Sequence, residues 1–184
     1  MNPNTGWRLP EGSILNACVL FNAGRSGKLP YSELQAVLPA VAALNRTSME
    51  VALNFEIHAC TDVTGFGILG HSLEMAKGCG LQLDLFFDRL PLYPNALGMY
   101  QKGESTGSNK ANRRLAQGYW EAAAGLAFEQ EELLFDPQTS GGLLLSVPAD
   151  QSDGLLADLK KAGIEAAARV GEVIDGPKPM IRVV

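Results

Sequence analysis

The stretch Ala59-Cys60-Thr61-Asp62-Val63-Thr64-Gly65-Phe66-Gly67 joins a predicted strand to a predicted helix through a glycine turn. The residues that lead into it, Phe55 to Cys60, have the composition of a short strand. Gly67 to Lys77 carries apolar residues at helical spacing, and Gly78 and Gly80 are typical of a helix C-terminus. This first motif therefore predicts a strand–turn–helix unit.

A second motif, Phe135-Asp136-Pro137-Gln138-Thr139-Ser140-Gly141-Gly142-Leu143, leads into the apolar segment Leu143 to Val147, which predicts a buried strand. Both motifs combine an acidic residue, hydroxyl side chains and glycines. A carboxylate can bind a divalent metal ion, and hydroxyl and backbone N–H groups can bind phosphate oxygens. Together the motifs indicate chemistry on a metal-bound phosphate compound.

The other segments predict strands and helices in alternation, which is typical of the α/β or α+β class. Further strands are expected at Ile14–Phe21, Leu81–Phe86, Arg169–Ile174 and Met180–Val184. Further helices are expected at Ala96–Gln101, Glu129–Leu134 and Ser152–Ala162, and from Ser32 to about Leu53 with a break at Pro39. Residues 1–13 have the composition of an irregular lead-in, and residues 102–112 that of a long polar loop.

Length and composition favour a single globular domain. The chain has 184 residues, 46% of them hydrophobic, and its formal net charge is −5. Binding to a nucleic-acid backbone requires clustered Lys and Arg, so we expect no nucleic-acid partner. A nucleotide site needs only a few cations or a metal ion and is compatible with this charge.

The three cysteines, Cys18, Cys60 and Cys79, have no C-x-x-C spacing, which argues against a disulfide framework or a zinc site. Reduced thiols are typical of cytoplasmic proteins. No apolar run approaches the ~20 residues of a membrane-spanning helix, and Met1 to Glu11 lacks a signal-peptide pattern. We therefore expect a cytoplasmic protein without a membrane segment.

Each motif also has a purely structural interpretation. Asp62 could bind a cation, or it could cap the following helix and accept backbone N–H groups in the turn. Thr139-Ser140-Gly141-Gly142 could closely approach a phosphate or the first motif, or it could form only a tight turn capped by Asp136. The sequence leaves these alternatives open.

The histidines and the cysteine near the motifs are each isolated in the sequence, which favours a structural interpretation. His58 and His71 lack a second His or Cys at ligand spacing, so we interpret both as structural histidines. Cys60 lies two residues from Asp62 but has no basic partner nearby in the sequence, so we interpret it as a buried, unreactive thiol.

At these residues the chain resembles selenophosphate synthetase (selenide, water dikinase), a branch of the aminoimidazole ribonucleotide synthetase-like superfamily. The resemblance is carried by residues 61–71 and 136–144, and the loops at residues 21–30 and 103–110 are also similar to that enzyme. It extends over residues 14–184. It implies an α/β domain with a mixed β-sheet covered by helices.

The resemblance also implies an activity. Enzymes of this family use ATP, Mg²⁺ and selenide to form selenophosphate, AMP and phosphate. Only their C-terminal domain is matched here, and the N-terminal catalytic domain, with its nucleophilic Cys or selenocysteine and essential Lys, is absent. We therefore expect a truncated form, a split gene product or a decayed reading frame without dikinase activity of its own, and we assign it no catalytic residue.

By this resemblance Asp62 corresponds to the aspartate of the C-terminal domain that helps to hold Mg²⁺ against the ATP phosphates. Cofactor binding is assigned to hydroxyl and glycine residues of the two motifs: Thr61, Thr64, Gly65, Gly67, Thr139, Ser140 and Gly141. One aspartate is too few ligands for Mg–ATP. The expected assembly is therefore a homodimer or a pairing with an N-terminal domain that supplies the other ligands.

Two alternatives remain open. Relatives in the superfamily act on purine precursors, on thiamine phosphate or in hydrogenase maturation, so the chain could act on another phosphorylated substrate. It could also be a non-catalytic module for nucleotide binding or assembly.

Overall fold

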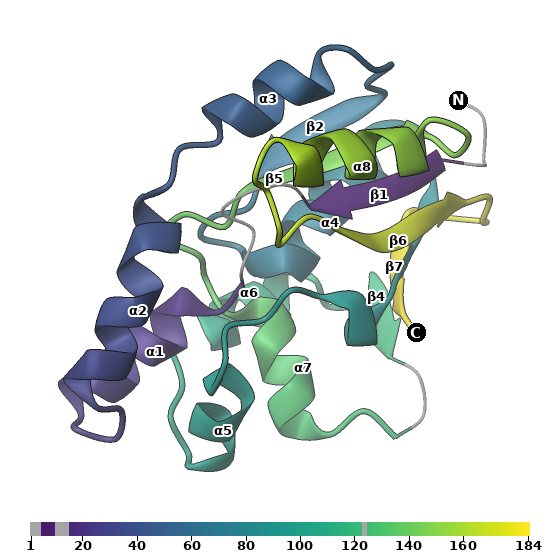
Figure 1. Ribbon diagram of the computed structural model, residues 1–184. Coiled ribbons are helices and arrows are strands. Elements are labelled where there is room, and N and C mark those ends of the chain that lie inside the picture. The colour runs from purple at the N-terminus through teal and green to yellow at the C-terminus, as the bar shows by residue number, and fades with distance from the viewer. Residues whose placement is uncertain (1–4, 10–14, 123–124) are drawn as a thin grey trace.

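The computed structural model describes residues 5–9, 15–122 and 125–184. A mixed seven-stranded sheet runs through these residues in the order β2-β5-β1-β6-β3-β7-β4 (Figure 1). Its strands are β1 (Thr5–Leu9), β2 (Ala59–Asp62), β3 (Gln82–Leu85), β4 (Trp120–Ala122), β5 (Leu143–Pro148), β6 (Ala168–Ile174) and β7 (Met180–Val183). Across the sheet, each strand from β2 through β5, β1 and β6 to β3 is antiparallel to its neighbour. Strand β7 is parallel to β3 on one side and to β4 on the other. The prediction of an α/β domain with a mixed sheet is therefore confirmed.

Eight α-helices and one short 3₁₀ helix surround the sheet in the described ranges. They are α1 (Ala17–Arg25), α2 (Tyr31–Ala42), α3 (Arg46–Ala52), α4 (Gly67–Cys79), η1 (Phe87–Arg89), α5 (Ala96–Gln101), α6 (Asn109–Leu115), α7 (Phe128–Phe135) and α8 (Ser152–Lys161). In Figure 1, α3 and α8 lie at the top of the view and α5 and α7 at the bottom. None of these helices has the length and apolar character needed to span a bilayer.

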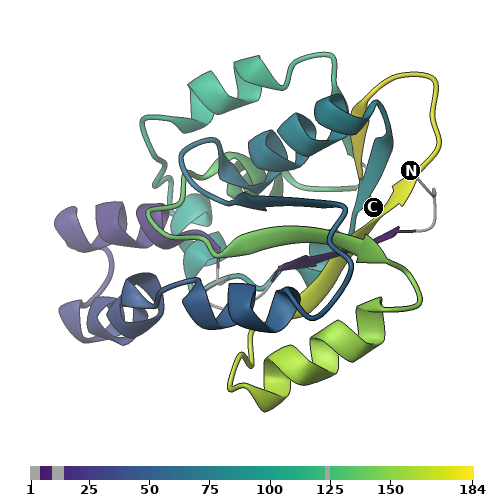
Figure 2. The same ribbon diagram turned by 90° about the horizontal axis from the view of Figure 1, so that it is seen from above.

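Strand β5 contacts two separate cores, one on each face of the sheet. Leu143, Leu145 and Val147 pack with residues of α3 and α8, whereas Leu144 packs into the larger core on the other face. Figure 2 shows α8 and α4 on opposite sides of the sheet. Because β5 is buried on both faces, its sequence is mostly apolar, with Ser146 as its polar residue. Packing on both faces therefore holds in place the strand that follows the second motif.

The predicted strand at Ile14–Phe21 is wrong, because α1 begins at Ala17 and Leu15 forms only an isolated β-bridge with Leu92. Its buried side chains include Val19, Leu20 and Ala23, which follow helical spacing. Short apolar runs do not distinguish a buried strand from a buried helix. Asn16, immediately before the helix, has a φ of 79°.

The predicted irregular lead-in at residues 1–13 is wrong for Thr5–Leu9, which form β1. This strand is hydrogen-bonded to β5 on one side and to β6 on the other. Backbone hydrogen bonds to a neighbouring strand on each side define β1. The composition of residues 1–13, which is polar and includes Gly and Pro, does not indicate that pairing. The rest of the lead-in lies outside the described residues.

Four smaller features also differ from the predictions. Pro39 lies inside α2, and the chain breaks instead at Ala43, where the backbone is extended. Strand β2 is shifted toward the C-terminus and ends at Asp62 rather than before it. Helix α6 occupies the end of the predicted loop at residues 102–112, and β4 was not predicted. The other predicted elements are confirmed to within a few residues.

Candidate functional site

The two motifs lie side by side and are joined through their backbones. Strands β2 and β5 pair so that Asp62 is opposite Leu143. Beyond the strands, the amide of Val63 donates to the carbonyl oxygen of Gly142 at 2.9 Å, and the amide of Gly141 donates to the Val63 oxygen at 3.0 Å. Of the interpretations that the sequence left open for the second motif, the structure therefore shows the close approach to the first motif.

Two glycines permit this contact. A Cβ atom on Gly141 would lie 2.6 Å from the carbonyl oxygen of Val63. Gly67 has a φ of +70°, and a Cβ there would lie 2.8 Å from the carbonyl oxygen of Leu134. The amides of both glycines already donate within the protein, Gly67 to the Thr64 oxygen at 3.1 Å and Gly141 to Val63. These two residues therefore bring the motifs together and do not present free amides to a ligand.

Asp62 presents an exposed carboxylate at the end of β2. Within the described residues its side chain has no hydrogen bond or ion pair, and α4 begins without a side-chain cap. The capping interpretation of Asp62 is therefore wrong. The described residues contain no group of three or more His, Cys, Asp or Glu able to hold a metal ion. Asp62 thus fits a divalent cation as a single ligand of a larger site.

The hydroxyl residues of the two motifs differ in accessibility. Thr139 is exposed, while Thr61, Thr64 and Ser140 are half-buried. Gly65 is exposed, with open space where a Cβ would stand. These groups surround the contact between the motifs and remain candidates for binding an anionic ligand.

Cys60 is exposed, so the prediction that it is buried is wrong. Its pKa is nevertheless raised, mainly by desolvation and also by the nearby charge of Asp62. A raised thiol pKa lowers the fraction of nucleophilic thiolate. The interpretation of Cys60 as unreactive is therefore supported by its environment.

Asp136 does not cap the turn of the second motif but is fully buried below it. The hydroxyl of Tyr100 donates to Asp136 Oδ1 at 3.0 Å, and Asn109 Nδ2 donates to the Tyr100 oxygen at 2.9 Å. Desolvation raises the pKa of Asp136 to about 7, while the Tyr100 hydroxyl and the backbone amide of Val19 oppose this shift. No pattern in the sequence indicates Tyr100 or Asn109 as partners of Asp136.

The pKa of Asp136 makes the stability of the fold dependent on pH. Between about pH 4 and about pH 7 the folded carboxyl group keeps a proton that the unfolded chain releases. The free energy of unfolding is therefore expected to fall by roughly 4 kcal/mol across this range and to level off above it. In Asp136→Asn, which retains an oxygen for Tyr100, this fall should disappear. Urea unfolding at a series of pH values measures it, and an unchanged slope in the variant would refute the assignment.

The start of α1 is attached to the second motif through Asn16 and Gln138. Gln138 Oε1 accepts the backbone amide of Asn16 at 2.8 Å, and Asn16 Nδ2 donates to the carbonyl oxygen of Leu133 at 2.7 Å. Cys18 Sγ lies 3.5 Å from Thr139 Oγ1. Sequence reasoning did not select Asn16, although an Asn in the left-handed region is a recognisable signal once the backbone is known.

The two histidines are placed as expected for structural residues. His71 on α4 is buried, with Thr64 Oγ1 3.2 Å from its Nε2 and Glu74 Oε2 3.0 Å from its Nδ1. His58 Nε2 lies 3.0 Å from Glu56 Oε1. Of the two, only His71 contacts a candidate site residue.

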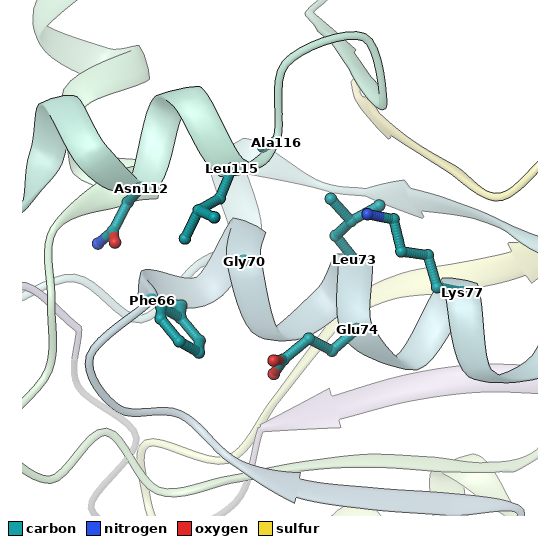
Figure 3. Close-up of a pocket in the computed structure, with 8 residues that line it drawn as sticks. All are labelled: Phe66, Gly70, Leu73, Glu74, Lys77, Asn112, Leu115 and Ala116. Carbon is teal, nitrogen blue, oxygen red and sulfur yellow. The ribbon is translucent and has the colours of Figure 1, made fainter.

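A cavity of about 180 Å³ lies between α4 and α6, next to the first motif (Figure 3). Its lining is mostly apolar and includes Phe66, Leu73 and Leu115, with Glu74 and Lys77 at one side. None of the predicted cofactor-binding residues lines it. The cavity is therefore separate from the exposed carboxylate of the candidate metal site.

The sequence matches the family described as AIR synthase related protein, C-terminal domain, over residues 21–184. It is 38% identical over 182 residues to a selenide, water dikinase of Pelobacter propionicus, covering 99% of this chain and 52% of that protein. It is 33% identical over 181 residues to a selenide, water dikinase of Clostridium botulinum, covering 98% and 52%. The chain thus spans about half the length of these curated relatives.

Solved structures share the fold. The hydrogenase maturation protein HypE of E. coli matches with a TM-score of 0.68 and 17% identity, over 100% of this chain and 46% of that one. A structure of HypE in complex with ATP matches with a TM-score of 0.61 and 18% identity, over 96% and 44%. At this level of identity the likeness concerns the fold alone.

Proposed function

Because the chain belongs to the family of AIR synthase related proteins, in their C-terminal domain, we propose that it forms one half of the Mg–ATP site of a selenophosphate synthetase-like enzyme. The named activity of its curated relatives, at 33% and 38% identity, supports selenide as the second substrate. The products would be selenophosphate, AMP and phosphate. The domain would comprise residues 14–184 together with β1.

The observation that carries this proposal is the exposed carboxylate of Asp62, which has no side-chain partner among the described residues and lies beside the joined motifs. Mg²⁺, when bound, neutralises the charge of the ATP phosphates. Asp62 would be one of its ligands. The hydroxyls of Thr61, Thr139 and Ser140 would orient the phosphates, while Gly67 and Gly141 hold the two motifs in contact.

A partner is needed to complete the site. A magnesium ion bound to ATP requires several oxygen ligands, and the described residues contain no group of three or more His, Cys, Asp or Glu that could supply them. Large apolar side chains are exposed close to the first motif, with Phe66 43% and Leu115 61% exposed. We propose that an N-terminal domain, or a second copy of this chain, covers this surface in a cytoplasmic assembly.

Calorimetric titration of Mg–ATP into the purified chain tests the proposal. We expect weak binding that requires magnesium, without selenide-dependent release of AMP, because Asp62 supplies only part of the ligand set and the Cys60 thiol has a raised pKa. Binding of ATP that is indifferent to magnesium would contradict the role of Asp62. Turnover of ATP and selenide by the isolated chain would contradict the need for a partner.

A further inference from the structure

The side chains of Glu74, His71 and Thr64 form a hydrogen-bonded series that ends in the turn of the first motif. Glu74 Oε2 lies 3.0 Å from His71 Nδ1, and His71 Nε2 lies 3.2 Å from Thr64 Oγ1. His71 and Glu74 belong to α4, whereas Thr64 lies in the turn two residues after Asp62. The series therefore connects the helix to the candidate metal site.

The partners of His71 determine where the proton of a neutral ring lies. A carboxylate oxygen only accepts hydrogen bonds, so the Nδ1 atom facing Glu74 must carry the hydrogen. In a neutral ring Nε2 then has a lone pair and accepts. The other tautomer would direct the lone pair of Nδ1 at the carboxylate and lose this bond. In the neutral ring the hydroxyl of Thr64 therefore donates to Nε2.

Packing holds the imidazole ring in this position. His71 is only 6% exposed, and the ring of Phe66 lies against it with centroids 5.4 Å apart. Gly70 makes room for Phe66, since a Cβ there would lie 2.6 Å from the Cβ of Phe66. Figure 3 shows Phe66 and the Glu74 carboxylate on the same side of α4. The ring has little freedom to exchange its partners.

We propose that Glu74 and His71 are positioning residues that direct the hydroxyl hydrogen of Thr64 inward. The Thr64 oxygen then offers only lone pairs to an approaching group. Phosphate oxygens also lack hydrogens, so they cannot donate to the Thr64 oxygen. A water molecule held by a divalent cation can donate a hydrogen bond to it. Thr64 would thus serve the hydrated metal ion beside Asp62 rather than a phosphate. This last step rests on the proposed function, whereas the orientation of the hydroxyl does not.

The orientation is tested by ¹⁵N NMR of the histidine rings in the full chain without nucleotide. The signals of His71 are identified by their persistence in His58→Gln. At a pH where the ring is neutral we expect a protonated Nδ1 and an unprotonated, hydrogen-bonded Nε2. Thr64→Val should shift Nε2 toward the value of a free nitrogen, whereas Thr64→Ser should leave it unchanged. Glu74→Gln should produce a mixture of tautomers, because an amide can also donate to Nδ1.

A wild-type ring protonated at Nε2 would overturn the proposal, as would an Nε2 signal that is unaffected in Thr64→Val. A second measurement addresses the metal. Thr64→Val is expected to weaken Mg–ATP binding by roughly tenfold and Thr64→Ser to restore it. Equal affinity of wild type and Thr64→Val would overturn the role toward the cation. Absence of Mg–ATP binding by the wild-type chain would count against the proposed function, while the ring signals would still decide the orientation.

Discussion

Replacement of Asp62 by asparagine is expected to reduce selenide-dependent ATP turnover by at least about a hundredfold in a complete enzyme. The change keeps the size of the side chain and removes the negative charge that would face Mg²⁺. The assay uses a hybrid in which this chain replaces the matching half of the Pelobacter propionicus dikinase. Release of AMP and phosphate from ATP is measured with and without selenide.

The same variant separates loss of the site from loss of the fold. Asp62 has no side-chain partner among the described residues, so its replacement should change the free energy of unfolding by less than about 0.5 kcal/mol. Asp150→Asn, which removes an exposed carboxylate from the turn after β5, is the matched control and should retain full turnover. Activity of Asp62→Asn close to that of the control would exclude Asp62 as a metal ligand.

The elements that the sequence predicts well have strong local signals. Helix α4 has apolar residues at helical spacing and a glycine at its end, and β5 is a mostly apolar segment. Strand β1 lacks such a signal, because its place in the sheet depends on pairing with β5 and β6. The segment that forms α1 was wrongly predicted as a strand for a related reason. Its apolar run fits either structure until the contacts of Asn16 with the second motif are known.

The candidate site was predicted in the same uneven way. Both motifs, and Asp62 within the first, were identified from hydroxyl residues, glycines and an acidic residue next to predicted strands. Each of these residue types can be recognised in the sequence without knowledge of its contacts. The buried contacts of Asp136 with Tyr100, and of Thr64 with His71, were not visible. They join residues whose pairing depends on how α4, α5 and the motifs pack, and no local pattern encodes that packing. These residue types therefore identified the two motifs but not the hydrogen bonds that support them.

Gly67→Ala is expected to have the largest effect on the fold. Gly67 has a φ of +70°, where an L-residue costs about 1–2 kcal/mol. The added Cβ would also lie within 3.0 Å of three backbone atoms of residues 134–136, and backbone atoms cannot move aside as a flexible side chain can. We expect a total loss of about 3 kcal/mol or more, together with separation of the two motifs.

Gly78 provides the matched control for this prediction on the same helix. It has an ordinary helical φ, and a Cβ there would meet no atom within 4 Å. Gly78→Ala is therefore expected to raise the stability by up to about 1 kcal/mol, because alanine favours the helix over the unfolded chain. Urea unfolding of both variants beside the wild type gives the comparison. If Gly67→Ala proved as stable as Gly78→Ala, the contact between α4 and the second motif would not be the close one described, and the joined site would lose its structural basis.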